Sequence, residues 1–195
     1  MFKQLSIAVA ALSASLAMSS NAATIPYPNI GTPAPTSSFV AEADGGVTAY
    51  FYATDAGYNS MIGMWVNGVP TGLYGLMNRT SSYGDSFFLG NVSAGDHLTF
   101  ELKVLTTGTS WYSDETLNSD GKNHAYATNF GGGGLIPAGA YTYVAFEDLP
   151  DLGDFDYNDH QFVFTNIKTS VPEPFSLALF GLGIIALGVA RKRIV

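Results

Sequence analysis

Leu98-Thr99-Phe100-Glu101-Leu102-Lys103-Val104 alternates apolar and polar residues without interruption. Successive side chains of a β-strand point to opposite faces of a sheet, so this alternation predicts a strand with one face in a core and the other in solvent. Ala94-Gly95-Asp96, which His97 separates from this stretch, are typical of a turn and predict where the strand begins.

Other short stretches of the chain have the same character, because they are rich in aromatic and β-branched residues. They are Val47 to Ala53, Met61 to Val69 with the turn Asn67-Gly68, Tyr141 to Phe146, and Gln161 to Thr165. Gly131 to Gly134 is expected to be a loop, and no segment between the strands shows a sustained helical period. Short strands separated by turns predict a single all-β domain over residues 39–168, a β-sandwich or jelly roll.

The charge of the chain restricts its functions. Between Ala23 and Ser170, four basic residues stand against fifteen acidic ones, a net charge of −11. Nucleic-acid binding requires clustered Lys and Arg, so we expect no nucleic-acid partner. Cysteine is absent, which excludes disulfides and cysteine-based metal or nucleophile chemistry.

The N-terminal residues 1–22 predict a secretory signal peptide. A basic start at Lys3 precedes an apolar run from Leu5 to Met18 and a small-x-Ala site at Ser20-Asn21-Ala22. Residues 23–38 contain four prolines and predict an extended lead-in, because proline cannot donate to a β-ladder.

The C-terminal residues 171–195 combine three features in order. Pro172-Glu173-Pro174 precedes the uncharged apolar segment 175–190, which predicts a transmembrane helix, and Arg191-Lys192-Arg193 follows. The basic triplet should stay in the cytoplasm, which places the domain outside the inner membrane. A plain tail anchor would have the same apolar and basic parts.

This arrangement resembles the PEP-CTERM sorting signal of Gram-negative, biofilm-forming bacteria. The resemblance implies an exosortase-type enzyme as partner and cleavage near the Pro-Glu-Pro. It also implies a transient stay in the inner membrane, then a place at the cell surface or in the exopolysaccharide matrix.

Acidic residues concentrate between positions 147 and 159, where six of the thirteen residues are Asp or Glu and none is Lys or Arg. A divalent cation would relieve the repulsion among these carboxylates. Asp154-x-Asp156-x-Asn158 offers oxygen donors at every second residue, and oxygen is what Ca²⁺ prefers. Asp159 stands where an EF-hand has its turn glycine, so an EF-hand is not matched. A solvated acidic turn, or Asp and Asn acting only as turn formers, remain alternatives.

The same stretch resembles the closing segment of a family of uncharacterised domains in exported bacterial proteins. Phe146-Glu147-Asp148, Gly153, Asp154-Phe155-Asp156-Tyr157-Asn158-Asp159 and Phe162-Val163-Phe164 fit that segment in order, with one departure at His160-Gln161. The loop Asn118 to His124 resembles a second motif of the family. The resemblance implies a β-sandwich that binds Ca²⁺. The candidate metal ligands are Glu147, Asp148, Asp154, Asp156, Asn158, Asp159 and Asp120.

Catalysis is not expected from the sequence. The three histidines lack a zinc-binding spacing, and no Gly-x-Ser-x-Gly elbow or phosphate-binding loop occurs. Glu147 and Asp154 could form the carboxylate pair of a glycoside hydrolase, but their place on one short loop favours a metal.

The expected function is a structural or binding role at the cell surface or in the matrix. The alternative is a carbohydrate-binding module for exopolysaccharide. Trp111 and Tyr112 are the candidate glycan contact, because they lie in the polar stretch from Thr106 to Ser113 and would form an exposed aromatic platform there.

Overall fold

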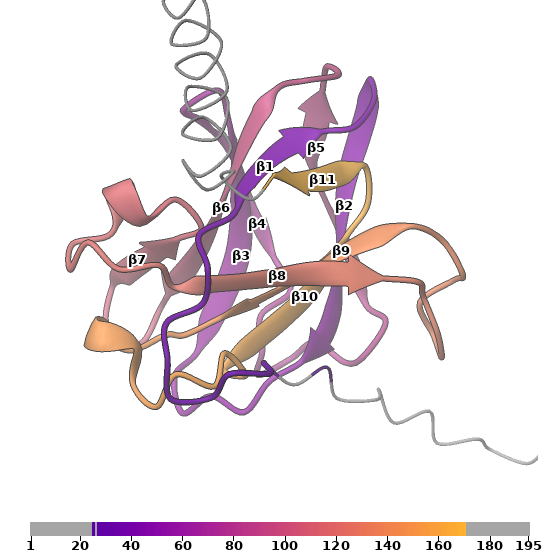
Figure 1. Cartoon of the computed structure of the whole chain (residues 1–195). Coiled ribbons are helices and arrows are strands. Elements are labelled where there is room, and N and C mark those ends of the chain that lie inside the picture. The colour runs from indigo at the N-terminus through magenta and orange to yellow at the C-terminus, as the bar shows by residue number, and fades with distance from the viewer. Residues whose placement is uncertain (1–24, 26, 171–195) are drawn as a thin grey trace, which may run out of the picture.

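The computed structural model describes residue 25 and residues 27–170, which form two antiparallel sheets with almost no helix (Figure 1). The strands are β1 Ser38–Ala41, β2 Gly45–Ala53, β3 Ser60–Val66, β4 Val69–Gly75, β5 Ser86–Val92, β6 His97–Val104, β7 Thr109–Tyr112, β8 Ala125–Phe130, β9 Tyr141–Phe146, β10 His160–Phe164 and β11 Ile167–Ser170. Two three-residue 3₁₀ turns, η1 Glu115–Leu117 and η2 Pro150–Leu152, complete the described part.

The first sheet has six strands in the order β11-β1-β6-β3-β4, with β7 also paired to β6. β1 pairs with His97 and Leu98 at the start of β6, whereas β7 pairs with the residues from Glu101 to Val104 at its end. Both strands thus lie on one side of β6, one after the other, and leave a gap between them.

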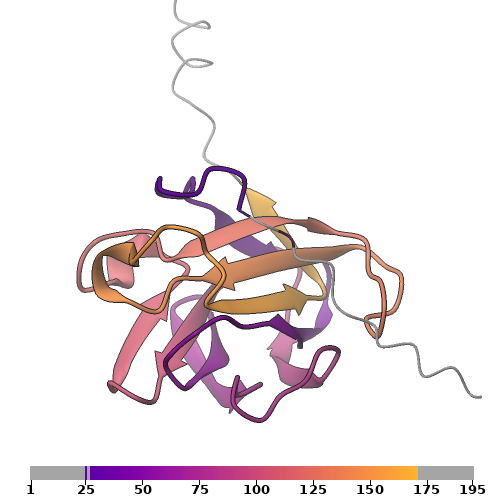
Figure 2. The ribbon, with the colours of Figure 1, turned by 90° about the horizontal axis from the view of Figure 1, so that it is seen from below.

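The second sheet has five strands in the order β5-β2-β10-β9-β8. β9 and β10 pair in register from Thr142 with Phe164 to Phe146 with His160. The residues between Phe146 and His160 therefore form one closed loop at the end of this hairpin. Figure 2 shows this orange loop at one end of the molecule, beside the pink segment that precedes β8.

The main core lies between the sheets. Phe100 of β6 stacks on Phe164 of β10 with ring centroids 4.1 Å apart, and Phe39 of β1 meets Phe100 edge-on. Burying an aromatic side chain of this size contributes about 1.5–3 kcal/mol. The contact between strands of different sheets makes the two sheets a β-sandwich.

The predicted strands are confirmed, and β9 has the predicted bounds. The Asn67-Gly68 turn is also confirmed: both residues have positive φ, 49° and 80°, as a two-residue hairpin turn requires. Six further strands, β1, β4, β5, β7, β8 and β11, were not predicted.

The lead-in is more than a linker where the structure describes it. Tyr27 and Ala34 are buried, and Ala34 donates its N–H to the hydroxyl of Tyr157 at 2.9 Å. A second, tyrosine-rich cluster forms where this segment covers the outer face of the five-stranded sheet. The folded unit therefore begins earlier than the predicted boundary at residue 39.

The predicted signal peptide and most of the sorting tail, with its transmembrane segment 175–190, lie outside the described residues. Within the described part, no helix is long and apolar enough to span a membrane.

Candidate functional site

The loop between β9 and β10 gathers three carboxylates. One oxygen each from Glu147, Asp154 and Asp156 lies within 4.8 Å of the others. Oxygens on opposite sides of a Ca²⁺ ion, each at about 2.3–2.6 Å from it, are about 5 Å apart. The spacing of the three oxygens therefore fits one shared Ca²⁺ ion.

The backbone of the loop is held in an uncommon conformation. Phe155 and Tyr157 have φ of 61° and 52°, although neither is glycine. A left-handed residue with a side chain costs about 1–2 kcal/mol, and such strain concentrates at functional sites. These two residues alternate with Asp154, Asp156 and Asn158, so the polar residues recur with a common spacing along the loop.

Tyr157 fixes the loop to the rest of the domain. Its N–H donates to Glu147 Oε1 at 2.7 Å, and its buried hydroxyl donates to the carbonyl of Asn123 at 2.9 Å. The same hydroxyl accepts the N–H of Ala34 from the lead-in. The lead-in, the segment before β8 and the acidic loop therefore meet at one side chain.

Burial and mutual repulsion perturb the acidity of the site. Glu147 is only 1% exposed. Burial, together with the charges of Asp159, Asp154 and Asp156, raises its pKa to about 8, against the opposing hydrogen bond from Tyr157. Burial is also the main cause that raises the pKa of Asp159 to about 7, and burial and Asp154 raise that of Asp156. Within the described part of the chain, none of these four carboxylates forms a salt bridge.

The other predicted ligands have protein partners of their own. Asp148 Oδ2 lies 3.0 Å from His160 Nε2, and Asp159 Oδ2 accepts the backbone N–H of Asp148 at 2.9 Å. Asn158 donates through its side-chain amide to Asp156, which leaves the amide oxygen of Asn158 for a metal.

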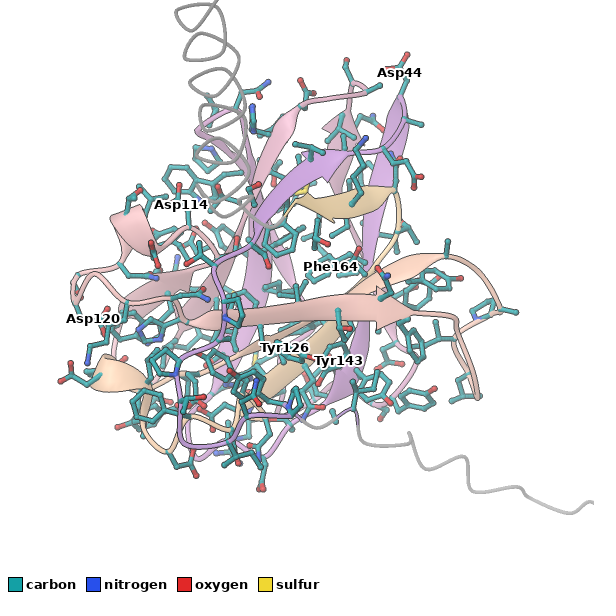
Figure 3. The ribbon with its side chains drawn as sticks, viewed as in Figure 1. Asp44, Asp114, Asp120, Tyr126, Tyr143 and Phe164 are labelled. Carbon is teal, nitrogen blue, oxygen red and sulfur yellow. The ribbon has the colours of Figure 1, made fainter. Side chains whose placement is uncertain are left out.

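Asp120 lies at the same end of the molecule but has a different role (Figure 3). It accepts the N–H of Asp151 and faces His124 Nε2, both at 3.0 Å. Asp151 in turn pairs with Lys122 at 2.8 Å on the surface. Asp120 therefore ties the acidic loop to the segment before β8 and is not among the three clustered carboxylates.

Sequence reasoning did not include Asp55, which follows β2. Its N–H donates to the carbonyl of Asn158 at 3.2 Å, and its charge adds to the rise in the pKa of Asp156. About a hundred residues separate Asp55 from the loop, so no local pattern in the sequence could associate them.

The prediction of an exposed aromatic platform at Trp111 and Tyr112 is wrong. Trp111 is 2% exposed, belongs to β7 and stacks on His124 with ring centroids 3.9 Å apart. Its indole N–H donates to the carbonyl of Asp148 at 2.8 Å. A sugar could not reach this ring, since Trp111 is part of the core beneath the acidic loop, while Tyr112 is half-buried and meets Trp65 edge-on.

Comparison with known proteins gives four findings, of which the first three concern the sorting motif, the curated proteins and the solved structures. The PEP-CTERM protein-sorting motif matches residues 170–193, which identifies an exported protein that an exosortase sorts. No curated protein matches the chain. A solved structure, the Ralstonia solanacearum high-affinity mannose-binding lectin, shares 22% identity, with 69% of this chain and 91% of the lectin covered and a TM-score of 0.34.

The body of the chain matches a family as well. The family model described as a domain of unknown function, DUF4114, covers residues 55–166. The match starts at Asp55 and includes the whole acidic loop, and its length exceeds half of the chain. The protein therefore belongs to the DUF4114 family.

Proposed function

We propose that this protein is a non-enzymatic structural or binding component of the cell surface or biofilm matrix, and that Ca²⁺ stabilises its β9–β10 loop. The observation that carries the calcium proposal is Glu147, a carboxylate 1% exposed that faces Asp154 and Asp156. None of these three carboxylates forms a salt bridge with a described residue. The sorting motif supports the location, because exosortase substrates are exported.

The donor set favours Ca²⁺ over other metals. Zn²⁺ prefers nitrogen and sulfur ligands, whereas the clustered ligands here are oxygens. Mg²⁺ requires near-ideal octahedral geometry, while Ca²⁺ accepts six to eight oxygens in variable arrangements, including carbonyls and water. A loop with an exposed Asp154 can supply three carboxylates and leave the remaining positions to Asn158, a backbone carbonyl and water.

Ca²⁺ would act on stability. A ligand that binds only the folded chain stabilises it by an amount that increases with ligand concentration. In this loop, the ion would replace carboxylate repulsion with attraction and would offset the strain at Phe155 and Tyr157.

The geometry gives little support to hydrolysis. A glycoside hydrolase needs two carboxyl groups that flank a bound sugar. Glu147 is buried and accepts the N–H of Tyr157, so its carboxylate is not open to a polymer substrate. The nearby histidines are also buried in local contacts, His124 against Trp111 and His160 against Asp148.

Calorimetric titration and thermal unfolding of the full chain with Ca²⁺ test the proposal. We expect heat of binding and a higher Tm for the unaltered protein. Asp154→Asn and Asp156→Asn should weaken binding at least tenfold. Asp151→Asn is the matched control, because it removes the same charge from the same loop at a residue outside the cluster.

An unaltered protein that shows neither heat nor a rise in Tm at saturating Ca²⁺ would refute the calcium site. Equal losses of Ca²⁺ affinity in Asp151→Asn and Asp154→Asn would also count against the site, because they would indicate a general effect of charge on the loop.

A further inference from the structure

A groove of about 610 Å³ lies on the outer face of the six-stranded sheet, away from the acidic loop residues. It forms where β1 and β7 leave a gap along β6, around Thr99. The segment 36–38 and the turn η1 border it, and Asp114, the N-cap of η1, marks its position in Figure 3. The volume is within the range of about 300–1,000 Å³ typical of small-molecule sites.

Trp65 of β3 lines this groove from the outward face of the sheet. Ile62 and Met64 of β3 belong to the core, so Gly63 and Trp65 point outward by the alternation of the strand. The indole is half-buried and pairs across the strands with Thr99. The ring of Tyr112 meets it edge-on, with centroids 5.7 Å apart and an interplanar angle of 88°.

Glu101 holds this indole in one orientation. It is 4% exposed although it lies on the outward face of β6. Three side chains donate to its carboxylate: Trp65 Nε1 at 2.7 Å, the hydroxyl of Tyr74 at 2.7 Å and Ser110 Oγ at 2.6 Å. The ring of Tyr74 lies directly over Gly63, where any side chain would collide with it.

A buried carboxylate is a costly way to stabilise a sheet, because well-packed apolar residues often do so equally well. Here the network instead fixes the position of an aromatic ring that borders an open groove. Preorganisation of this kind reduces the entropy lost when a ligand binds. Glu101 is therefore a positioning residue for Trp65.

Three of the residues that line the groove carry side-chain groups with no hydrogen bond among the described residues. Thr99 Oγ1, the ring of His97 and Asp114 Oδ2 make no hydrogen bond within the described part of the chain. The remaining lining residues are small, polar or apolar: Thr36, Ser37, Ser38, Phe39, Asn67, Gly68, Leu98, Ser113 and Leu117.

No lysine or arginine occurs among these lining residues, and Asp114 adds a negative charge. This composition disfavours phosphates and acidic polysaccharides. A fixed aromatic ring beside the Thr99 hydroxyl, the His97 imidazole and one carboxylate oxygen of Asp114 suits a ligand with an apolar face and a rim of hydroxyls. We propose that the Trp65 groove binds a neutral saccharide, and this proposal does not depend on the calcium site.

Calorimetry with the full chain tests the proposal, in a detergent without a sugar headgroup. The probes are neutral oligomannoside, cello-oligosaccharide and xylo-oligosaccharide, with oligogalacturonate as the acidic comparison. We expect at least one neutral probe to bind, and Trp65→Ala to weaken that binding at least tenfold, which corresponds to about 1.4 kcal/mol. Glu101→Gln should raise Kd less and should also change the fluorescence of Trp65, because the indole loses its fixed acceptor.

Two further variants keep the test decisive if Trp65→Ala folds poorly. Thr99→Tyr places a large side chain in the groove and should abolish saccharide binding. The fold should be retained, because tyrosine is common in β-strands. Phe88→Ala removes an exposed aromatic residue from β5 of the other sheet and should leave binding unchanged. Binding by none of the neutral probes, binding by oligogalacturonate alone, or binding that survives both Trp65→Ala and Thr99→Tyr would overturn the proposal.

Discussion

Glu101 and Glu147 are both buried glutamates, but only Glu101 has all its hydrogen-bonding partners within the protein. We call its surroundings the completed network and those of Glu147 the incomplete site. Glu101 lies between regular strands and accepts hydrogen bonds from three neutral side chains. Glu147 begins a loop with left-handed residues, accepts one backbone N–H and faces other carboxylates. The protein alone satisfies the first carboxylate, whereas the second lacks a positive partner among the described residues.

The largest expected effect is at the completed network. Glu101→Ala leaves the N–H of Trp65 and the hydroxyls of Tyr74 and Ser110 without their acceptor, and we expect the free energy of unfolding to fall by about 3 kcal/mol. Urea unfolding measures this. Glu42→Ala, at an exposed residue, is the control and should change stability by less than about 0.5 kcal/mol. A loss at Glu101 no larger than that of the control would show that the network is not stabilising.

Substitution of Glu147, at the incomplete site, should instead increase the free energy of unfolding of the metal-free protein. Without metal and at about pH 8, Glu147→Gln removes a charge that burial and repulsion disfavour, while its side-chain oxygen can still accept the N–H of Tyr157. We expect the metal-free variant to be more stable than the unaltered chain by roughly 1–3 kcal/mol, and its response to Ca²⁺ to be lost. A metal-free variant that is less stable would mean that Glu147 is already satisfied by the protein.

The pH dependence of stability should distinguish the two regions too. The pKa of Glu147 rises from 4.5 to about 8, and that of Asp159 from 3.8 to about 7. A group whose pKa is higher in the folded chain than in the unfolded chain stabilises the fold fully at pH values below its unfolded pKa. This contribution is lost as the pH rises through the pKa of the folded chain. We therefore expect the metal-free protein to lose stability between about pH 5 and pH 8.

Thermal unfolding across this pH range, in chelator and in Ca²⁺, measures that loss. The lowered pKa of Asp96 and Asp120 acts with the opposite sign, but only in more acidic solution. Because Ca²⁺ displaces the protons, its affinity should increase as pH rises, and saturating Ca²⁺ should remove most of the loss. A Tm of the metal-free protein that stays constant between about pH 5 and pH 8 would contradict the raised pKa values of Glu147 and Asp159.

The smallest expected effect is at the surface of the same loop. Asp151→Asn breaks the pair with Lys122, in which both side chains are exposed. Exposed ion pairs contribute about 0–1 kcal/mol, so we expect a change in unfolding free energy of less than about 0.5 kcal/mol in urea, with or without Ca²⁺. A larger loss that depends on Ca²⁺ would indicate a general effect of charge on the loop and would count against a site confined to Glu147, Asp154 and Asp156.

Local patterns predicted those parts of the fold that local chemistry decides. The alternation from Leu98 to Val104 and the Asn67-Gly68 turn each depend on a few adjacent residues, and both were predicted from them. β1 and β11 were missed because each is four residues long and is stabilised by pairing with a strand distant in sequence.

The candidate sites show the same limit. The acidic residues were evident because they are adjacent in sequence, but their clustering into Glu147, Asp154 and Asp156 depends on the fold of the loop. Trp111 was predicted to be exposed because its neighbours are polar, whereas its partners, His124 and Asp148, come from later segments. Nothing in the sequence shows which face of β3 is buried, so the strand pattern alone could not place Trp65 on the outward face.

The most direct measurement is a crystal structure of the protein grown with Ca²⁺, with anomalous scattering used to locate the ion. We expect one Ca²⁺ ion coordinated by Glu147, Asp154 and Asp156, with carboxylate oxygens at about 2.3–2.6 Å from the ion. Well-ordered carboxylates with no ion between them at saturating Ca²⁺ would contradict this expectation.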